Sequence, residues 1–277
     1  MRDTPSQQVP SAPRPPDHVC AAFGVDAEAL RPAAGGAEWQ AGSIVLRPVS
    51  DKAETAWLAR TVRTLDVPGV SLARPVRATD GRQIIGGWIA YRGLDDDPAA
   101  QPSPPRFHDL VLASVKLHQA LAGIPCPEFL QRRYGTLATA DRLAWGEAEI
   151  ELDETAGGRW FEILAASLRP VTLPDQVVHG DLYRSVRWVA GKGPLVVDFV
   201  PFYRPAEWAT ALVVVDAVAR GGAGTGLIHS WSHLPEWSQM LLRAVLYRLA
   251  SHAIEPAADP APLDGLRRAG ALVSELV

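Results

Sequence analysis

The chain has 277 residues, of which 47% are hydrophobic and 21% charged, and its formal net charge is -4. This length and composition allow a sizeable core, either in one large domain or in two lobes of roughly 100 to 180 residues each. The slightly acidic balance and the lack of a basic run argue against nucleic-acid binding. The two cysteines, Cys20 and Cys126, are far apart and have no His or Cys neighbours at metal-ligand spacing, so neither a disulfide framework nor a zinc site is expected.

The first 16 residues include five prolines with serine and glutamine, a composition typical of disordered arms. Residues 95–105 are a second polar, proline-rich stretch and indicate a boundary between lobes. We therefore expect an arm at 1–16, a first lobe at 17–94, a hinge or connector at 95–105 and a second lobe at 106–277. The sequence has no apolar run that could span a bilayer and no secretory signal pattern, which predicts a cytoplasmic protein without membrane partners.

The first lobe has the pattern of a small antiparallel sheet with helices. A proline or aspartate begins a short helix that Gly24 ends, and Ser50 or Asp51 caps a longer helix. Asp80-Gly81 between alternating apolar runs is a strong hairpin signal. We predict helices at 16–24 and 51–65, and strands at 30–32, 38–40, 44–47, 71–77 and 83–91.

The second lobe is predicted to be mainly helical. Residues 107–121 place apolar side chains three and four positions apart, and His118 among them is expected to pack rather than to act in catalysis. The glycine cluster at 221–226 is not followed by the lysine of a phosphate-binding loop, so it is interpreted as a connection between helices. Further helices are predicted at 141–149, 160–168, 206–219 and 237–252.

Two apolar runs in this lobe each deliver an aspartate. The first, Val177-Val178-His179-Gly180-Asp181, is followed after a short link by Leu195-Val196-Val197-Asp198-Phe199. The link contains Gly191, Gly193 and Pro194, which predict a hairpin or tight loop that brings the two carboxylates together. One carboxylate can orient a hydroxyl and accept its proton while the other holds a divalent metal. The alternative is that both aspartates are ordinary turn residues.

His-Gly-Asp followed by an apolar-Asp-Phe element resembles the catalytic and metal-binding loops of the aminoglycoside phosphotransferase and choline kinase-like branch of the protein kinase superfamily. The resemblance covers most of the chain. The segment Asp198–Pro205 and the tryptophan-rich tail are most similar to an actinobacterial group within that branch. The resemblance implies an α+β, bilobal kinase-like fold, with a small antiparallel sheet in the first lobe and a mainly helical second lobe.

The resemblance also implies roles for the two aspartate motifs. Asp181, with His179 in the same motif, would be the catalytic base or orienter of the acceptor hydroxyl. Asp198 would bind Mg2+ on the phosphates of ATP or GTP. The family has an asparagine shortly after its catalytic aspartate, whereas Ser185 or Val186 falls there in this chain. A serine oxygen can still bind Mg2+, so Ser185 is the candidate second ligand.

The nucleotide site implied by the resemblance lies in the first lobe. Arg47 ends a strand where the family carries a phosphate-binding lysine, and Glu54 on the following helix would pair with that cation. Gly35 and Gly36 would let backbone amides approach the phosphates. The alternatives are a solvated arginine, a solvated glutamate and a plain hairpin turn.

Asp216 lies within an apolar helical run and needs a partner if it is buried. The resemblance suggests that it holds the catalytic loop, with Glu207 as a rival and a helix-surface position as the alternative. Arg47, the missing asparagine and Val200 in place of a glycine after Asp-Phe are three departures from the family pattern. Two hypotheses follow: a phosphotransferase acting on a small-molecule hydroxyl, and a degenerate kinase-like module that binds a nucleotide or small ligand without turnover.

Overall fold

The structure, a computed structural model, describes residues 13–33, 36–92, 106–188, 193–256 and 263–277. The predicted connector at 95–105 and most of the predicted arm at 1–16 lie outside these residues. The chain forms two compact units: the first comprises Met1–Asp66, Val70–Ser103 and Arg187–Asp198, and the second comprises Val67–Gly69, Pro104–Val186 and Phe199–Val277. Among the described residues, 187–188 and 193–198 group with the first unit.

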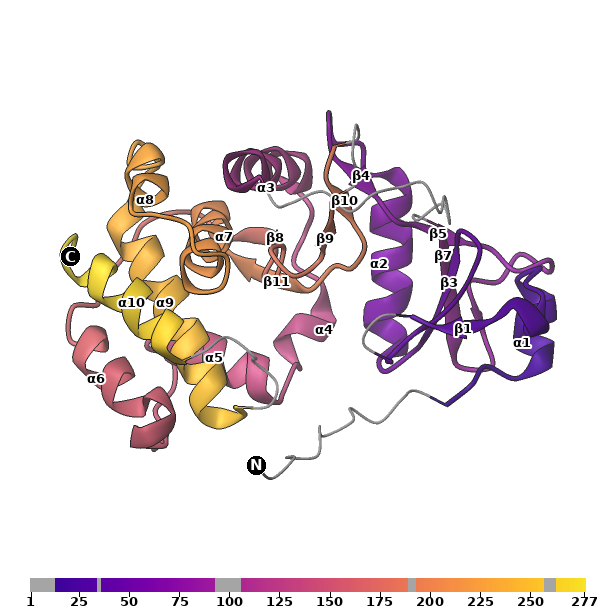
Figure 1. The fold of residues 1–277 in the computed structure, drawn as a ribbon, viewed down its shortest axis with the longest axis horizontal. Helices are drawn as coiled ribbons and strands as arrows, with labels where there is room; N and C mark the ends of the chain where they lie inside the picture. The colour runs from indigo at the N-terminus through magenta and orange to yellow at the C-terminus, as the bar shows by residue number, and fades with distance from the viewer. Residues whose placement is uncertain (1–12, 34–35, 93–105, 189–192, 257–262) are drawn as a thin grey trace, which may run out of the picture. The chain divides into compact units, whose positions relative to one another are not determined.

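The first unit contains an antiparallel sheet in the order β1-β2-β3-β7-β5, with β6 paired to β7 (Figure 1). Its strands are β1 (Arg31–Pro32), β2 (Trp39–Ala41), β3 (Ile44–Pro48), β5 (Arg74–Val76), β6 (Ile84–Ile85) and β7 (Trp88–Arg92). The predicted single strand at 83–91 is therefore wrong. Gly86 and Gly87 both have positive φ, at 54° and 81°, and form a two-residue turn that folds β7 back onto β6.

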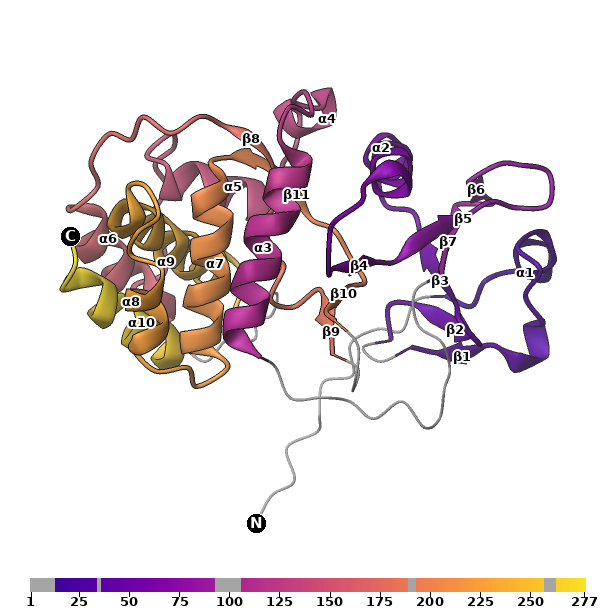
Figure 2. The same ribbon diagram turned by 90° about the horizontal axis from the view of Figure 1, so that it is seen from above.

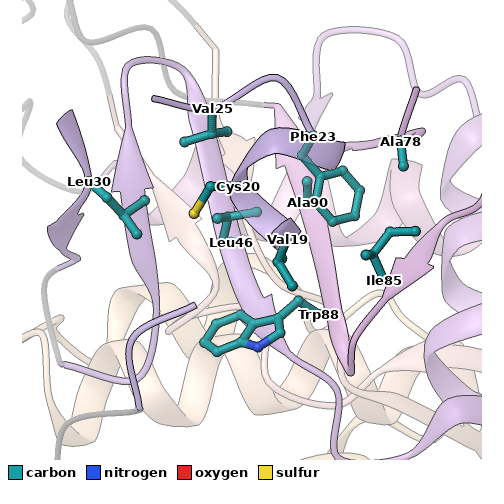
Figure 3. Close-up of a cluster of buried hydrophobic side chains, with 10 residues drawn as sticks. All are labelled: Val19, Cys20, Phe23, Val25, Leu30, Leu46, Ala78, Ile85, Trp88 and Ala90. Atoms are coloured by element: carbon teal, nitrogen blue, oxygen red, sulfur yellow. The ribbon is translucent and has the colours of Figure 1, made fainter. Parts of the chain in front are cut away.

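Helices complete the first unit. The short helix α1 (Asp17–Ala22) is followed by a 3-10 turn at Ala27–Ala29. The longer α2 (Lys52–Thr64) is capped by Asp51, whose carboxylate accepts the backbone N–H groups of Ala53 and Glu54. A buried cluster joins α1 to the sheet (Figure 3). Its members are Val19, Cys20, Phe23, Val25, Leu30, Leu46, Ala78, Ile85, Trp88 and Ala90.

A second, smaller sheet has the order β4-β10-β9. Its strands are β4 (Ser71–Leu72), β9 (Val186–Arg187) and β10 (Leu195–Val196). β10 pairs in parallel with β4, and backbone hydrogen bonds from Ser71 to Pro194 and from Ala73 to Val196 extend the pairing. The strand that precedes Asp198 is thus held in the first unit by residues from much earlier in the chain.

The second unit is mainly helical. Its helices are α3 (Phe107–Leu121), α4 (Glu128–Gln131), α5 (Thr136–Ala144), α6 (Arg159–Ala165), α7 (Ala206–Ala219), α8 (Gly226–Ser230), α9 (Trp237–Ile254) and α10 (Leu263–Ser274), with a π-helical turn at Glu154–Gly158. The almost fully buried α9 contacts α5, α6, α7 and α10 (Figure 1). The helix α3 lies beside α7 (Figure 2). Strands β8 (Gln176–His179) and β11 (Pro201–Arg204) form a two-stranded antiparallel ribbon that packs on α3 and α7.

The predicted bounds of α3 and α7 match the structure, but other helices differ. The predicted helix at 141–149 is instead α5, which ends at Ala144 because Gly146 takes a positive φ of 68°. The sequence reading missed α4, α8 and α10. Within the described parts of the chain, no helix is both long enough and apolar enough to cross a membrane.

Candidate active site

The loop after β8 carries Asp181, and its glycine is required by close packing. A Cβ atom on Gly180 would lie less than 3.0 Å from two atoms of the Phe202 ring. Phe202 is on β11, where it is paired across the ribbon with Val178. The backbone N–H of Gly180 donates to the carbonyl of Val200 at 2.8 Å. The His-Gly-Asp turn therefore fits against β11 only with glycine in the middle.

His118 of α3 fixes the start of this loop. Its ring is 1% exposed, and its Nε2 accepts the backbone N–H of His179 at 3.0 Å. Because Nε2 accepts, the ring proton lies on Nδ1, which is 3.2 Å from the hydroxyl of Ser114. Burial, with a smaller contribution from the nearby His179, lowers the pKa of His118 to about 3. His118 is therefore a neutral residue that supports the loop.

Two further hydrogen bonds close the loop around Asp181. The backbone N–H of Asp181 donates to Nδ1 of His179 at 3.1 Å, and the His179 residue is 0% exposed. The hydroxyl of Ser185 donates to the carbonyl of Asp181 at 2.9 Å, and Ser185 is 4% exposed. The side chains of His179 and Ser185 thus both bind the backbone of Asp181.

The carboxylate of Asp181 contacts arginines, which the sequence reading missed. Nη2 of Arg248, on α9, donates to its Oδ1 at 2.7 Å, and Nε of Arg184 lies 3.7 Å from its Oδ2. Arg248 also binds Asp216, which is buried on α7 as the sequence suggested. Asp216 is therefore linked to the loop through Arg248 and the side chain of Asp181. A sequence signal for this link existed, because Asp216 and Arg248 are charged residues that each lie within a run of mostly apolar residues.

In the first unit, Arg47 of β3 binds Asp198. Its Nη1 donates to Oδ1 of Asp198 at 2.5 Å, and its Nη2 donates to the carbonyl of Val197 at 3.2 Å. Its Nε donates to Oε1 of Glu38 at 2.5 Å. Burial lowers the pKa of Arg47, but Asp198 and Glu38 outweigh this effect and the pKa is raised. The guanidinium is also 5.2 Å from the centre of the Tyr91 ring.

The structure places Glu38 on Arg47. The β2–β3 register pairs Trp39 with Leu46, so Glu38 is the next residue across from Arg47. Glu54 lies in the first turn of α2. Gly36 takes a positive φ of 72° in the turn before Glu38, and Gly35 lies outside the described residues.

The carboxylate of Asp198 offers oxygen atoms of the kind that hard cations bind. The carboxylate of Asp198 is 44% exposed and already holds a positively charged group on Oδ1. Mg2+ is commonly bound by one or two carboxylates together with phosphate oxygens and water. Across the described ranges, no three His, Cys, Asp or Glu side chains gather as a complete metal site. A metal at Asp198 would therefore depend on ligands from a nucleotide and from water.

The sequence matches no protein-family model and no curated protein. Solved structures resemble it throughout. Amicoumacin kinase hAmiN in complex with AMP-PNP, Ca2+ and Ami superposes with a TM-score of 0.62 at 13% identity, covering 94% of this chain and 92% of that one. The AMP-bound spectinomycin phosphotransferase APH(9)-Ia gives 0.60 at 11% identity, covering 93% and 96%.

The aminoglycoside phosphotransferase from Alicyclobacillus acidocaldarius subsp. acidocaldarius DSM 446 gives a TM-score of 0.53 at 16% identity, covering 96% of this chain and 93% of that one. The chain has a protein kinase-like fold. It combines the antiparallel sheet of the first unit with a mainly helical second unit, as the α+β, bilobal expectation required. At these identities the kinase-like fold is shown, and the activity has to be argued from the residues.

Proposed function

We propose that this protein transfers the γ-phosphoryl group of ATP or GTP to a hydroxyl of a small molecule in a Mg2+-dependent reaction. The observation that carries the proposal is the contact between Arg47 and Asp198 in the first unit. It joins the cation that would bind the phosphates to the carboxylate that would bind the metal. Neighbours of the same fold solved with AMP-PNP or AMP support the nucleotide.

Each residue would have a defined task. Asp198 would hold Mg2+, which supplies charge neutralisation on the phosphates when bound. Arg47 would bind phosphate oxygens through its planar fork. Asp181 would orient the acceptor hydroxyl and take its proton. His179 would act through the backbone of Asp181, since its ring is buried.

Fewer observations support the roles proposed for Gly35, Gly36 and Ser185. Backbone amides of Gly35 and Gly36 would approach the phosphates. Ser185 could assist the metal only through the lone pairs of a hydroxyl whose proton is already donated to the carbonyl of Asp181. The narrower resemblance to an actinobacterial group and the lobe boundaries at 17–94 and 106–277 stay predictions.

We assign to Glu38 the pairing role that the resemblance implies for Glu54, because Glu38 binds Arg47 in this structure. Glu38→Gln should weaken MgATP binding roughly 3- to 10-fold, since the pair is partly exposed to water. Glu54→Gln is measured beside it, and a larger loss of affinity in Glu54→Gln than in Glu38→Gln would return the pairing role to Glu54.

A second candidate function is nucleotide binding without turnover. It is favoured by one observation: the hydroxyl of Ser185, the candidate second metal ligand, is buried and committed to the loop backbone. The family asparagine that would fill this place is absent from the sequence.

Two measurements together distinguish these proposals. The first is the melting temperature of the protein with ATP, GTP or ADP, each with and without Mg2+. The second is an assay of phosphoryl transfer to a hydroxyl acceptor. A ligand that binds only the folded state must raise the melting temperature. We expect a Mg2+-dependent shift that Asp198→Asn abolishes and Asp181→Asn keeps. Transfer to acceptors such as spectinomycin or hygromycin B, lost in Asp181→Asn, would support the enzyme. A shift without transfer to any hydroxyl acceptor would favour the binding module, and no shift would refute both.

A further inference from the structure

Two central helices of the second unit each bury a charged side chain. Asp216 on α7 is 0% exposed and Arg248 on α9 is 2% exposed. All other residues of α7 from Trp208 to Ala219 are buried as well. Taking an ion out of water costs several kcal/mol unless a group of opposite charge compensates. The contacts of Asp216 and Arg248 therefore explain how the helices tolerate them.

Arg248 binds Asp216 with two nitrogen atoms. Its Nε donates to Oδ1 at 3.0 Å and its Nη2 donates to Oδ2 at 2.5 Å. Two such bonds fix the plane of a guanidinium as well as its position. Arg220, the residue that follows α7, adds an Nε contact of 3.1 Å to Oδ1 of the same carboxylate. Asp216 therefore holds Arg248 in one orientation.

The same Nη2 of Arg248 also reaches Asp181. It donates to Oδ1 of Asp181 at 2.7 Å, and the Asp181 side chain is 16% exposed. The contact at the other carboxylate oxygen is longer: Nε of Arg184 is 3.7 Å from Oδ2. The Arg184 side chain is 42% exposed. One oxygen of Asp181 is thus fixed from inside the helical unit.

We infer that Arg248 is a positioning residue for Asp181 and is itself held by Asp216. The inference rests on the proposed function of Asp181 as the group that receives the acceptor proton. With Oδ1 fixed, Oδ2 is presented to the acceptor hydroxyl. The hydroxyl proton passes to Oδ2 while the acceptor oxygen bonds to phosphorus and the bond to the nucleoside diphosphate breaks. A misplacement of about 1 Å in such an arrangement can cost ~100-fold in rate.

Arg248→Lys tests the inference, because lysine keeps the charge but cannot hold two carboxylates with a planar fork. We expect it to lower kcat for phosphoryl transfer from MgATP roughly 10- to 100-fold while KM for MgATP stays within about threefold. Arg243→Lys is the matched control. Arg243 lies on the same helix, is 5% exposed, and donates to the backbone oxygens of Ala144 and Arg169.

Arg243→Lys should leave kcat within about threefold of the wild type even where it lowers the melting temperature as much as Arg248→Lys does. Equal losses of kcat in the two variants would overturn the inference. So would an Arg248→Lys protein with unchanged kcat.

A stability cycle separates failure of this inference from failure of the proposed function. The melting temperatures of Asp181→Asn, Arg248→Lys and the double variant are compared, with Arg243→Lys replacing Arg248→Lys in a control cycle. The losses in the first cycle should be non-additive and those in the control cycle additive. Additive losses in both cycles would refute the contact between Arg248 and Asp181. Non-additive losses in the first cycle, in a protein that transfers no phosphate, would count against the proposed function alone.

Discussion

Replacing His118 tests the buried support of the loop after β8. His118→Gln keeps a polar side chain whose amide oxygen can accept the N–H of His179, but it removes the group that titrates. The pKa of His118 in the folded protein is about 3, mainly because the ring is buried, against an ordinary value of 6.5. Below pH 6.5 the unfolded chain therefore binds a proton that the folded protein does not.

The direction of the pH dependence of stability follows from this difference in proton binding. Stability rises with pH wherever the unfolded state binds more protons, so the contribution of neutral His118 is complete above pH 6.5 and is lost as pH falls towards 3. The whole loss is about 5 kcal/mol in the free energy of unfolding. At pH 5 the loss is about 2 kcal/mol.

Urea unfolding of the wild type and of His118→Gln at pH 8 and at pH 5 measures this contribution. The wild type should lose about 2 kcal/mol more than the variant between the two pH values, whatever their difference at pH 8. His108→Gln is the matched control for replacing a histidine by glutamine, because His108 is exposed on the same helix. A His118→Gln curve that runs parallel to that of the wild type would refute a neutral, buried His118.

Two glycines give predictions from steric contact. Gly180→Ala should cost about 1 to 3 kcal/mol in unfolding free energy, because its Cβ would meet the buried Phe202 ring. Gly265→Ala should cost at least as much, because its Cβ would meet the carbonyl oxygen of Ala219 and backbone cannot move aside cheaply. Gly226→Ala, where no atom lies within 4 Å of the added Cβ, is the control for both. A urea midpoint for either variant equal to that of the control would contradict the packing described above.

The bounds of two helices were predicted correctly. In α3 the apolar residues recur three and four positions apart, and α7 is a long apolar run that Pro205 precedes and Gly221-Gly222 follow. It failed at 83–91, where alternation favours one strand and the Gly86-Gly87 turn divides it. It also missed α10, although Leu266, Ala269 and Val273 recur at helical spacing and are buried. At 83–91 the two glycines determine the turn in spite of the alternation.

Some contacts of the candidate site could be predicted from the sequence and others could not. The expectation that buried Asp216 needs a partner was correct, but its pairing with Arg248 depends on helix packing that periodicity does not specify. The pairing of Arg47 with Glu38 follows from the register of two predicted strands, so extending that register by one residue would have found it. The contact of Arg47 with Asp198 joins residues 151 positions apart and has no local signal.

The pairing of β4 with β10 has a consequence for synthesis of the chain. The first unit cannot be completed when its own N-terminal segment leaves the ribosome, because β4 lacks its partner strand and Arg47 lacks Asp198 until residues 195–198 have been made. A nascent chain that stops short of these residues keeps an open strand edge and an incompletely paired guanidinium. An N-terminal fragment ending at residue 103 would share both defects. The first unit is therefore complete only after Asp198 has been synthesised.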